Sequence, residues 1–239
     1  MNLIIDIGNS SSKVAIFKGK EIVKYKTFDK ITLPNILPFT NDFDISASII
    51  SSVIEIDNRI QAVISYFNSL ILTHNTALPI LSNYKTPKTL GKDRLAAIVG
   101  ANNKFLNRDI LVIDAGSCIT FDYFTNGNYS GGRISPGIQM RYDALHTFTA
   151  KLPQINFSNK HFMIGNDTNS SIIAGVQQGV LDEVDEGITT FIKENPESIV
   201  IVCGGSHKFF EKHLKNSIFA DPLIVLKGLN IILEFNAKK

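Results

Sequence analysis

Two carboxylates have the clearest chemical use in this sequence, because each ends an aliphatic run and stands just before a glycine. Asp6 lies in "LIIDIGNSSSK" and Asp114 lies in "ILVIDAGSCIT". Glycine can adopt a positive φ, which turns backbone N–H groups toward a ligand, and its lack of a Cβ lets a phosphate come close. A lone Asp-x-Gly is usually only a turn. Two copies between aliphatic runs predict a pair of ligand-binding turns.

The first of these turns is predicted to bind a phosphate that carries a metal ion. Hydroxyl and amide donors for phosphate oxygens follow the glycine at Asn9, Ser10, Ser11 and Ser12. Lys13 then adds a positive charge. Asp6 and a phosphate repel each other, so we expect Asp6 to hold a hydrated Mg²⁺, which keeps several of its waters. The sequence has neither a P-loop pattern nor a Gly-x-Gly-x-x-Gly after a strand, which disfavours P-loop and Rossmann proteins.

The surroundings of the two acids repeat in order, which predicts two similar α/β halves. Each acid sits in a strand–turn–strand–turn–strand unit, and helices and further strands follow both units. We therefore divide the chain into residues 1–111 and 112–239, with a cleft between the halves and one carboxylate turn in each. The expected strands are 2–7, 13–18, 21–28, 45–53 and 71–75, two strands within 109–124, and then 129–135 and 198–205, with a hairpin turn at 125–128.

Helical spacing of apolar residues predicts the remaining elements. Asp57 is expected to cap the first helix, Pro136 to lie near the start of the third, and residues 83–94 to form a loop. The expected helices are 57–70, 93–105, 135–152, 169–195, 207–214 and 230–236. A third glycine site, Gly204-Gly205, ends a buried strand. It permits either a close backbone approach to a nucleoside or only a tight strand-to-helix turn.

The bulk composition indicates a protein with a substantial core. The 239 residues are 44% hydrophobic with a formal net charge of +2, which argues against nucleic acid as a partner. Cys118 and Cys203 are expected to be buried free thiols. Without a signal peptide or a long apolar run, we expect a cytoplasmic protein that does not cross a membrane. The histidines lack zinc-ligand spacing, and the acidic run 181–187 is expected to be a solvated helix face.

Five short motifs resemble those of type III pantothenate kinases, a family of the actin, hexokinase and Hsp70 ATPase superfamily. The family patterns are D-x-G-N-[TS], G-x-D-R, D-x-G-T-x-x-T-x-D, G-G-x-I-x-P-G and G-x-[NDS]-T. In the same order, this chain has "DIGNS" (6–10), "GKDR" (91–94), "DAGSCITFD" (114–122), "GGRISPG" (131–137) and "GNDT" (165–168). G-x-D-R alone would indicate only a helix N-terminus with an acid favoured by the dipole, but all five in order are specific.

The resemblance implies a fold, a reaction and a set of site residues. The fold would be α/β, with two similar ribonuclease H-like halves (the actin-like ATPase fold) and an interdomain cleft. The reaction would be ATP-dependent phosphorylation of pantothenate to 4′-phosphopantothenate, the first step of coenzyme A biosynthesis. By motif position, ATP would be bound by Asp6, Ile7, Gly8, Asn9, Ser10, Ser11, Ser12, Lys13 and Ser117, and pantothenate by Tyr84, Gly91, Lys92, Asp93, Arg94 and Thr168.

The resemblance also implies roles for single residues. Asp93 would be the catalytic base that accepts the hydroxyl proton of pantothenate, and Arg94 could fix a carbonyl or carboxylate of that substrate by its fork geometry. Asp114 would bind a monovalent cation, potassium or ammonium, while Mg²⁺ would accompany ATP. The family further implies a homodimer.

Three departures from the family patterns stand out. Ser10 and Ser117 replace the usual threonines, which keeps the hydroxyl but loses the methyl group that stiffens the side chain. Cys118 is expected to serve packing, and Arg133, where a small residue is usual, to face solvent or a neighbouring subunit.

Two other groups of functions stay open on the sequence alone. One is an ATP-hydrolysing binding or regulatory module of the same superfamily, and the other is a kinase for a different small alcohol or a phosphatase on the same scaffold. The "GKDR" segment distinguishes a kinase from the ATP-hydrolysing module, because a base beside a binding arginine has no role in an ATPase switch.

Overall fold

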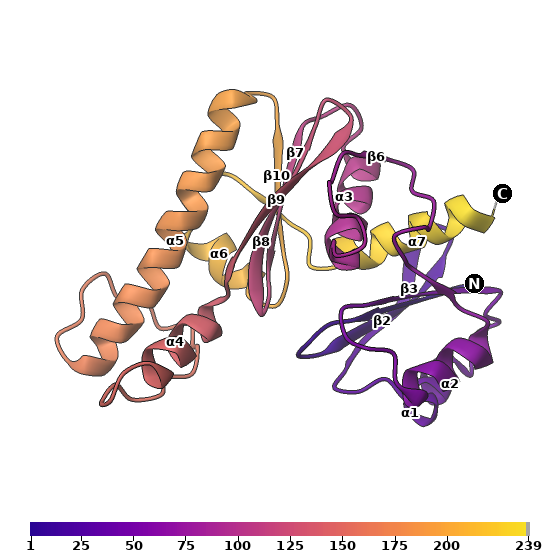
Figure 1. Cartoon of the computed structure of the whole chain (residues 1–239), viewed down its shortest axis with the longest axis horizontal. Coiled ribbons are helices and arrows are strands. Elements are labelled where there is room, and N and C mark those ends of the chain that lie inside the picture. Colours follow the sequence, from indigo (N-terminus) through magenta and orange to yellow (C-terminus); the bar gives the residue numbers. More distant parts are fainter. Residues whose placement is uncertain (238–239) are drawn as a thin grey trace. The chain divides into compact units, whose positions relative to one another are not determined.

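The computed structural model describes residues 1–237, and the chain forms two compact units (Figure 1). The first unit comprises Met1–Asn107, Gly127–Ser130 and the C-terminal segment from Leu223. The second comprises Arg108–Asn126 and Gly131–Pro222. Neither unit is one continuous stretch of sequence, because the C-terminal helix belongs to the first unit. The division at residue 112 describes a sequence repeat and stays a prediction.

The first unit is built on a five-stranded sheet with strand order β3-β2-β1-β4-β5. The strands are β1 (Asn2–Ile7), β2 (Ser12–Lys18), β3 (Glu21–Phe28), β4 (Ala47–Ser52) and β5 (Leu70–Ile71). β1 pairs antiparallel with β2 and parallel with β4. The strands predicted at 2–7 and 21–28 are confirmed to the residue.

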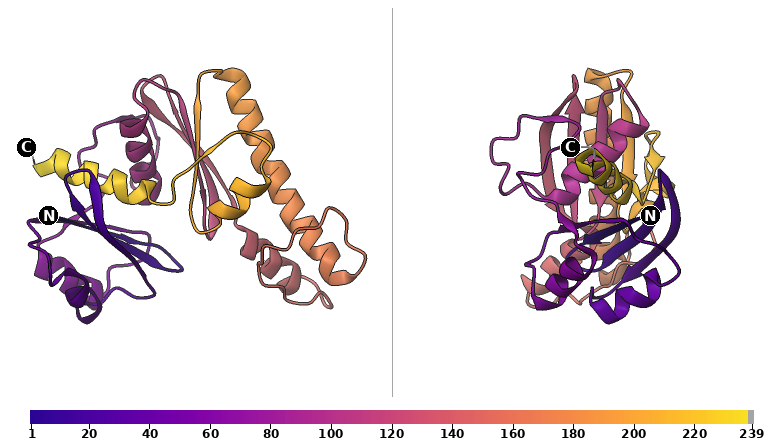
Figure 2. Two further views of the ribbon diagram at one scale, coloured as in Figure 1. Left: turned by 180° about the vertical axis from the view of Figure 1, so that it is seen from behind. Right: turned by 90° about the vertical axis from the view of Figure 1, so that its right-hand side faces the viewer.

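Helices cover both faces of this sheet (Figures 1 and 2). Helices α1 (Leu33–Thr40) and α2 (Asn58–Phe67) bury a core with Leu3, Ile5 and Ile7 of β1. Because side chains alternate along a strand, Asn2, Ile4 and Asp6 point to the opposite face. There the C-terminal helix α7 (Ile224–Ala237) packs, and the Asn2 side-chain amide donates to Asn230 of that helix.

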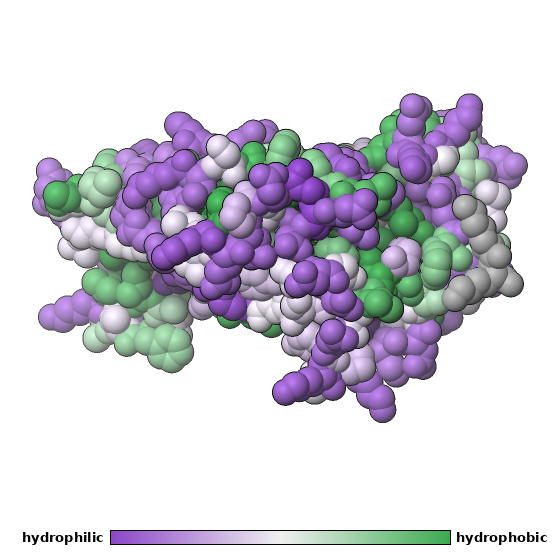
Figure 3. Space-filling view, turned by 90° about the horizontal axis from the view of Figure 1, so that it is seen from above, coloured by the Kyte–Doolittle hydropathy of each residue, from purple (hydrophilic) through white to green (hydrophobic). Residues whose placement is uncertain are grey.

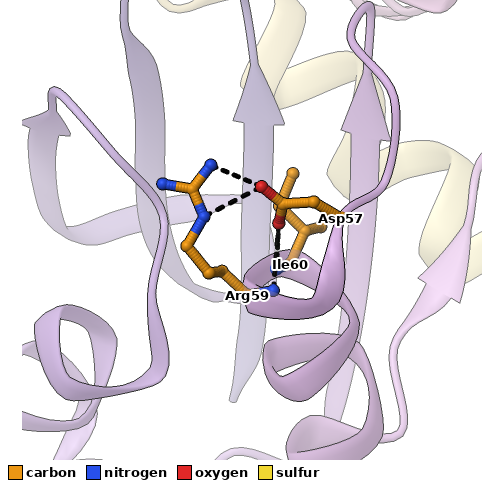
Figure 4. A network of polar contacts seen from close by, with 3 residues as sticks. All are labelled: Asp57, Arg59 and Ile60. Carbon is orange, nitrogen blue, oxygen red and sulfur yellow. Dashed lines mark hydrogen bonds and ion pairs between the residues drawn. The ribbon is translucent and has the colours of Figure 1, made fainter.

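Asp57 caps helix α2, as its sequence position predicted (Figure 4). Its carboxylate accepts hydrogen bonds from the backbone N–H groups of Arg59 and Ile60, both at 3.0 Å, and from the Arg59 guanidinium. These bonds, the one from the Arg59 side chain above all, lower the pKa of Asp57. A capped first turn fixes where the helix begins.

Two helical segments were missed by the sequence patterns. Helix α1 contains Pro34 and Pro38, which suppress a helical prediction, yet it forms because Thr32 caps it and Pro34 falls in its first turn. Helix α7 begins at Ile224 rather than at residue 230. Its early part includes Gly228, a weak helix former, and is stabilised by packing against helix α3 (Lys92–Lys104).

The second unit contains most of a six-stranded sheet with strand order β11-β10-β7-β8-β9-β6. Its strands are β7 (Ile110–Ala115), β8 (Cys118–Thr125), β9 (Asn128–Pro136), β10 (Ile199–Cys203) and β11 (Phe219–Ala220). The predicted hairpin turn is confirmed by Asn126 and Gly127, which both have positive φ. In the first unit, β6 (Leu81–Ser82) pairs with Asn128 and Tyr129, the first residues of β9.

Three helices cover one face of the second sheet (Figure 1). They are α4 (Ile138–Thr147), α5 (Thr168–Glu194) and α6 (His207–His213). Leu111 and Ile113 of β7 and Phe121 of β8 meet these helices in a buried core. Helix α5 starts at a capping box between Asp167 and Ser170, close to its predicted start. No helix among residues 1–237 is long and apolar enough to cross a membrane.

The prediction of a solvated face for residues 181–187 is wrong for two of its acids. Asp185 is only 8% exposed, and its carboxylate accepts hydrogen bonds from the backbone N–H groups of Lys215 and Asn216. Glu183 forms an ion pair with Arg141 of α4. Burial alone would raise the pKa of Glu183, but hydrogen bonds from Ser135 and Arg141, with nearby positive charge, lower it. Both acids therefore hold neighbouring segments against α5.

Gly228→Ala tests the close contact of α3 and α7. A Cβ at this position would overlap the carbonyl oxygen of Ala96, so we expect a loss of about 1–3 kcal/mol or more in the free energy of unfolding. The measurement is urea unfolding followed by circular dichroism. Gly179→Ala on α5 is the matched control, since nothing lies within 4 Å of its added Cβ. It should stabilise by up to about 1 kcal/mol, and equal losses for both variants would contradict the packing argument.

Candidate active site

Asp6 stands on the α7-facing side of the first sheet, at the end of β1. Asp6 has a register partner on each neighbouring strand. These partners are Lys13 of β2 and Ser51 of β4. Residues paired in this way have their side chains on the same face of the sheet. Asp6 and Lys13 are both half-buried. The predicted metal-holding acid and the predicted phosphate-binding lysine are thus neighbours on adjacent strands.

The turn after Asp6 differs from its prediction in one respect. Neither Gly8 nor Gly116 has a positive φ, and the Gly8 N–H donates to the Ser11 carbonyl at 3.1 Å rather than pointing outward. The expectation of a positive-φ nest at these glycines is therefore wrong. Glycine is favoured at residue 8 for a steric reason, because a Cβ would lie 2.9 Å from the Ser11 carbonyl oxygen.

The predicted phosphate contacts around this turn fall into two groups. Asn9 and Ser10 are exposed and Ser11 is half-buried, so these three residues lie at least partly at the surface. Ile7 and Ser12 are buried, and Ile7 belongs to the core under α1 and α2. A ligand at this turn could reach these two residues mainly through their backbone.

The turn after Asp114 is enclosed by two glycines from distant parts of the second unit. The Gly137 N–H donates to the Ser117 carbonyl at 3.2 Å, and a Cβ on Gly137 would overlap this turn. Gly204 has φ 84°, and its Cα lies against the Asp114 carboxylate, where a Cβ has no room. The tight-turn interpretation of Gly204 is therefore confirmed, and its contact to a nucleoside stays a prediction.

The start of helix α3 explains why glycine precedes Asp93 by two residues. The Asp93 carboxylate accepts the Arg94 N–H at 2.9 Å and folds back over Gly91, where a Cβ would lie 2.6 Å from Asp93 Oδ1. Asp93 thus lies in the first turn of a helix, where the dipole favours a negative charge. Burial lowers the pKa of Lys92, and the charge of Asp93 partly opposes this. The Lys92 ammonium donates to the Leu90 carbonyl at 2.8 Å.

Arg94 and Tyr84, both predicted to contact pantothenate, lie together in the first unit. The Arg94 guanidinium carbon is 6.0 Å from the centre of the Tyr84 ring. Tyr84 stacks in turn on the buried Tyr129, with ring centres 6.0 Å apart. The sequence did not predict Tyr129 as a support, because its contact depends on the pairing of β6 with β9.

Thr168 lines a cavity of about 1040 Å³ between α4 and α5 in the second unit. Apolar side chains such as Leu145 and Ile172 form most of its wall, with Arg141 and Asn166 adding polar groups. Thr168 is the first residue of α5, directly after the cap Asp167. Hydrogen bonds from Ser170 lower the pKa of Asp167, so this acid serves the helix start.

Arg133 is exposed, in line with the expectation that it faces solvent or a neighbouring subunit, and it also packs within its own unit, which the sequence did not predict. Its guanidinium carbon lies 4.5 Å from the centre of the Phe121 ring, and its NH2 group donates to the Tyr123 hydroxyl at 2.6 Å. Gly187 of α5 leaves room for this side chain.

Cys118 and Cys203 are free thiols, as predicted, although only Cys203 is fully buried.

The two mixed sheets and their helices define an α/β protein with the actin-like ATPase fold. The activator of the 2-hydroxyisocaproyl-CoA dehydratase from Clostridium difficile, solved with bound ADPNP, has this fold. It aligns with a TM-score of 0.57 and 13% sequence identity, covering 99% of this chain and 95% of that chain. The predicted fold class is confirmed.

The sequence profile of type III pantothenate kinases matches residues 2–190. A type III pantothenate kinase from Phocaeicola vulgatus is 44% identical over 241 residues, covering 100% of both chains. Another from Bacteroides fragilis is 41% identical over 242 residues, covering 99% of this chain and 98% of the relative. The chain therefore belongs to the type III pantothenate kinase family.

Gly204→Ala tests whether Asp114 depends on close backbone packing. The positive φ and the missing space for a Cβ should together cost about 1–3 kcal/mol of unfolding free energy. Gly205→Ala, whose added Cβ would meet nothing within 4 Å, should stay within about 0.5 kcal/mol of the original protein. Thermal unfolding of the two variants gives the comparison. A tolerated alanine at position 204 would remove this explanation of the Gly-Gly pair.

Proposed function

We propose that this protein transfers the γ-phosphoryl group of ATP to the hydroxyl of pantothenate, giving ADP and 4′-phosphopantothenate at the start of coenzyme A biosynthesis. Family membership supports the reaction. The geometric support is Asp93, an oriented carboxylate at the start of α3, next in sequence to Arg94, which lies against Tyr84. A base beside a substrate-binding arginine fits transfer to an alcohol better than an ATPase switch.

Binding of ATP is assigned to residues 6–13 and to Ser117. Phosphoryl transfer passes through a loose transition state, so positioning and charge neutralisation supply most of the catalysis. The exposed side chains Asn9 and Ser10 can donate to phosphate oxygens, and Lys13 adds charge on the same sheet face as Asp6. The half-buried carboxylate of Asp6 is a hard oxygen donor that suits Mg²⁺ held through water. When bound with ATP, that ion neutralises phosphate charge.

Acceptance of the hydroxyl proton is assigned to Asp93. An ionised carboxylate needs no unusual pKa for this task, because it must accept the proton only as the hydroxyl attacks. The hydrogen bond from the Arg94 N–H fixes its orientation, and Gly91 leaves room for it.

Binding of pantothenate is assigned to the segment from Gly91 to Arg94, with Tyr84 and Thr168. The Arg94 fork can hold a carbonyl or carboxylate of the substrate. Lys92 takes part through its backbone, since its ammonium holds the preceding loop by a bond to Leu90. Thr168 lines the cavity of the second unit, whose mixed wall suits a substrate with both apolar and polar parts.

Asp114 is assigned to a monovalent cation, potassium or ammonium. The residues present fit such an ion, because the Asp114 carboxylate is half-buried beside a turn rich in backbone carbonyls. A weakly hydrated cation can be held by one carboxylate and carbonyl oxygens, and there it would offset phosphate charge.

The two free thiols support a reducing, cytoplasmic setting for the reaction.

A homodimer is proposed through the second unit. Several large apolar side chains are exposed near the Thr168 cavity, with Phe148 at 86% and Ile164 at 85%. Hydrophobic side chains also reach the surface in places on the face drawn in Figure 3. Large apolar groups left exposed in this way favour contact with another protein surface.

Asp93→Asn is expected to keep the binding of ATP and pantothenate while phosphorylation falls about 10²–10⁴-fold, the range for loss of a general base. The asparagine keeps the shape and the hydrogen bond to the Arg94 N–H but cannot accept the proton. Calorimetry would measure binding, and a coupled assay of ADP release would measure turnover. Asp42→Asn, an exposed acid of the same unit, is the matched control. An equal loss of binding would make Asp93 structural, and turnover indifferent to pantothenate would favour the ATPase alternative.

Phe148→Asp combined with Ile164→Asp should convert the proposed dimer to a monomer, because charge would replace the apolar contact. Light scattering after size-exclusion chromatography would measure the mass. Leu106→Asp changes a similarly exposed apolar side chain of the first unit, 67% exposed, and should leave the dimer intact. A monomeric original protein would contradict the proposal.

A further inference from the structure

Ser51 is a buried polar residue that the reaction scheme above does not use. It lies in β4, is 0% exposed, and its hydroxyl has no hydrogen-bond partner among residues 1–237. Ser48 of the same strand is also buried, but its hydroxyl is paired with that of Ser69 at 2.9 Å. Burying an unpaired hydroxyl costs free energy that alanine at this position would not. Stability alone therefore gives no reason for serine at residue 51.

The strand register places this hydroxyl beside the candidate metal-holding acid. Ser51 is the register partner of Asp6 in the parallel pair of β4 and β1, so both side chains lie on the same face. Neighbouring strands are about 4.8 Å apart, a separation that a serine hydroxyl and a carboxylate can bridge by a change of side-chain torsion. Lys13 occupies the matching position on β2. Three polar side chains thus form one row across three neighbouring strands of the sheet.

We propose that Ser51 is a positioning residue for Asp6, and this proposal rests on the assignment of MgATP to residues 6–13. In the MgATP-bound protein, the Ser51 hydroxyl donates a hydrogen bond to one oxygen of the Asp6 carboxylate. The other oxygen then faces the hydrated cation in a fixed orientation. A partner of this kind behind a metal-holding group typically changes metal affinity by about 10–100-fold.

The proposal predicts opposite effects of Ser51→Ala on stability and on binding. Without nucleotide, the variant should unfold at the same temperature as the original protein or higher, because an unpaired buried hydroxyl is removed. Its affinity for MgATP should fall about 10-fold, the effect of one hydrogen bond to a charged group. Its affinity for ATP in excess chelator should not change. A merely structural serine would not make nucleotide affinity sensitive to Mg²⁺ in this way.

Calorimetric titration of ATP with Mg²⁺ and with chelator, on the full chain, tests these expectations. Ser48→Ala is the matched control, a buried serine of the same strand on the opposite face, and should leave the Mg²⁺ dependence intact. In an Asp6→Asn background, Ser51→Ala should have no further effect on MgATP affinity, because the ionised carboxylate that Ser51 would orient toward Mg²⁺ is already absent.

Three results would overturn the proposal: unchanged MgATP affinity in Ser51→Ala, equal losses with and without Mg²⁺, or a full loss that persists in the Asp6→Asn background. Failure of the proposed kinase function would look different. It would appear as ATP turnover indifferent to pantothenate in the original protein, a readout that does not enter the Ser51 comparison.

Discussion

A negative charge at the end of an apolar strand is the constraint on which the candidate site depends. A carboxylate is costly to remove from water unless it is paired or hydrogen-bonded. Asp6 and Asp114 limit this cost because they stand where β1 and β7 reach their turns, and there both residues stay partly exposed. The strands before them are buried, so the backbone of each acid is fixed by the sheet. Each unit thereby holds one carboxylate on a strand whose backbone is fixed by its neighbours in the sheet.

The two carboxylate turns are stabilised in different ways. The first is stabilised by a hydrogen bond within the turn, which the Gly8 N–H donates to the Ser11 carbonyl three residues later. The second is held from outside by Gly137, which precedes α4, and by Gly204, which follows β10. Glycine is required there because three backbone segments approach too closely for a Cβ. The position of Asp114 therefore depends on packing between parts of the chain that are far apart in sequence.

This difference explains how much could be predicted from the sequence. Signals carried by a few adjacent residues were sufficient for β1 and β3, the Asp57 cap and the Asn126–Gly127 turn. Features that depend on a distant partner were missed, including the start of α7 and the Tyr129 support behind Tyr84. The positive φ expected at Gly8 failed for a local reason, because the constraint on this glycine is its close contact with the Ser11 carbonyl. A sequence shows that a glycine is present but not which neighbouring atom makes it necessary.

The acids of this protein differ in where they stand, and three of them lie in segments that the sequence predicted to bind ligands. Asp57 and Asp167 accept backbone N–H groups at helix starts, and the buried Asp185 accepts those of residues 215 and 216. These acids satisfy the orphan donors of their own unit. Asp6, Asp93 and Asp114 instead stand at the ends of strands or at a helix start, each within two residues of a glycine, and remain half-buried. In the first group the carboxylate completes the fold, and in the second it stands partly exposed beside a glycine, so the proposed contacts with a phosphate, a cation or a hydroxyl are assigned to the second group.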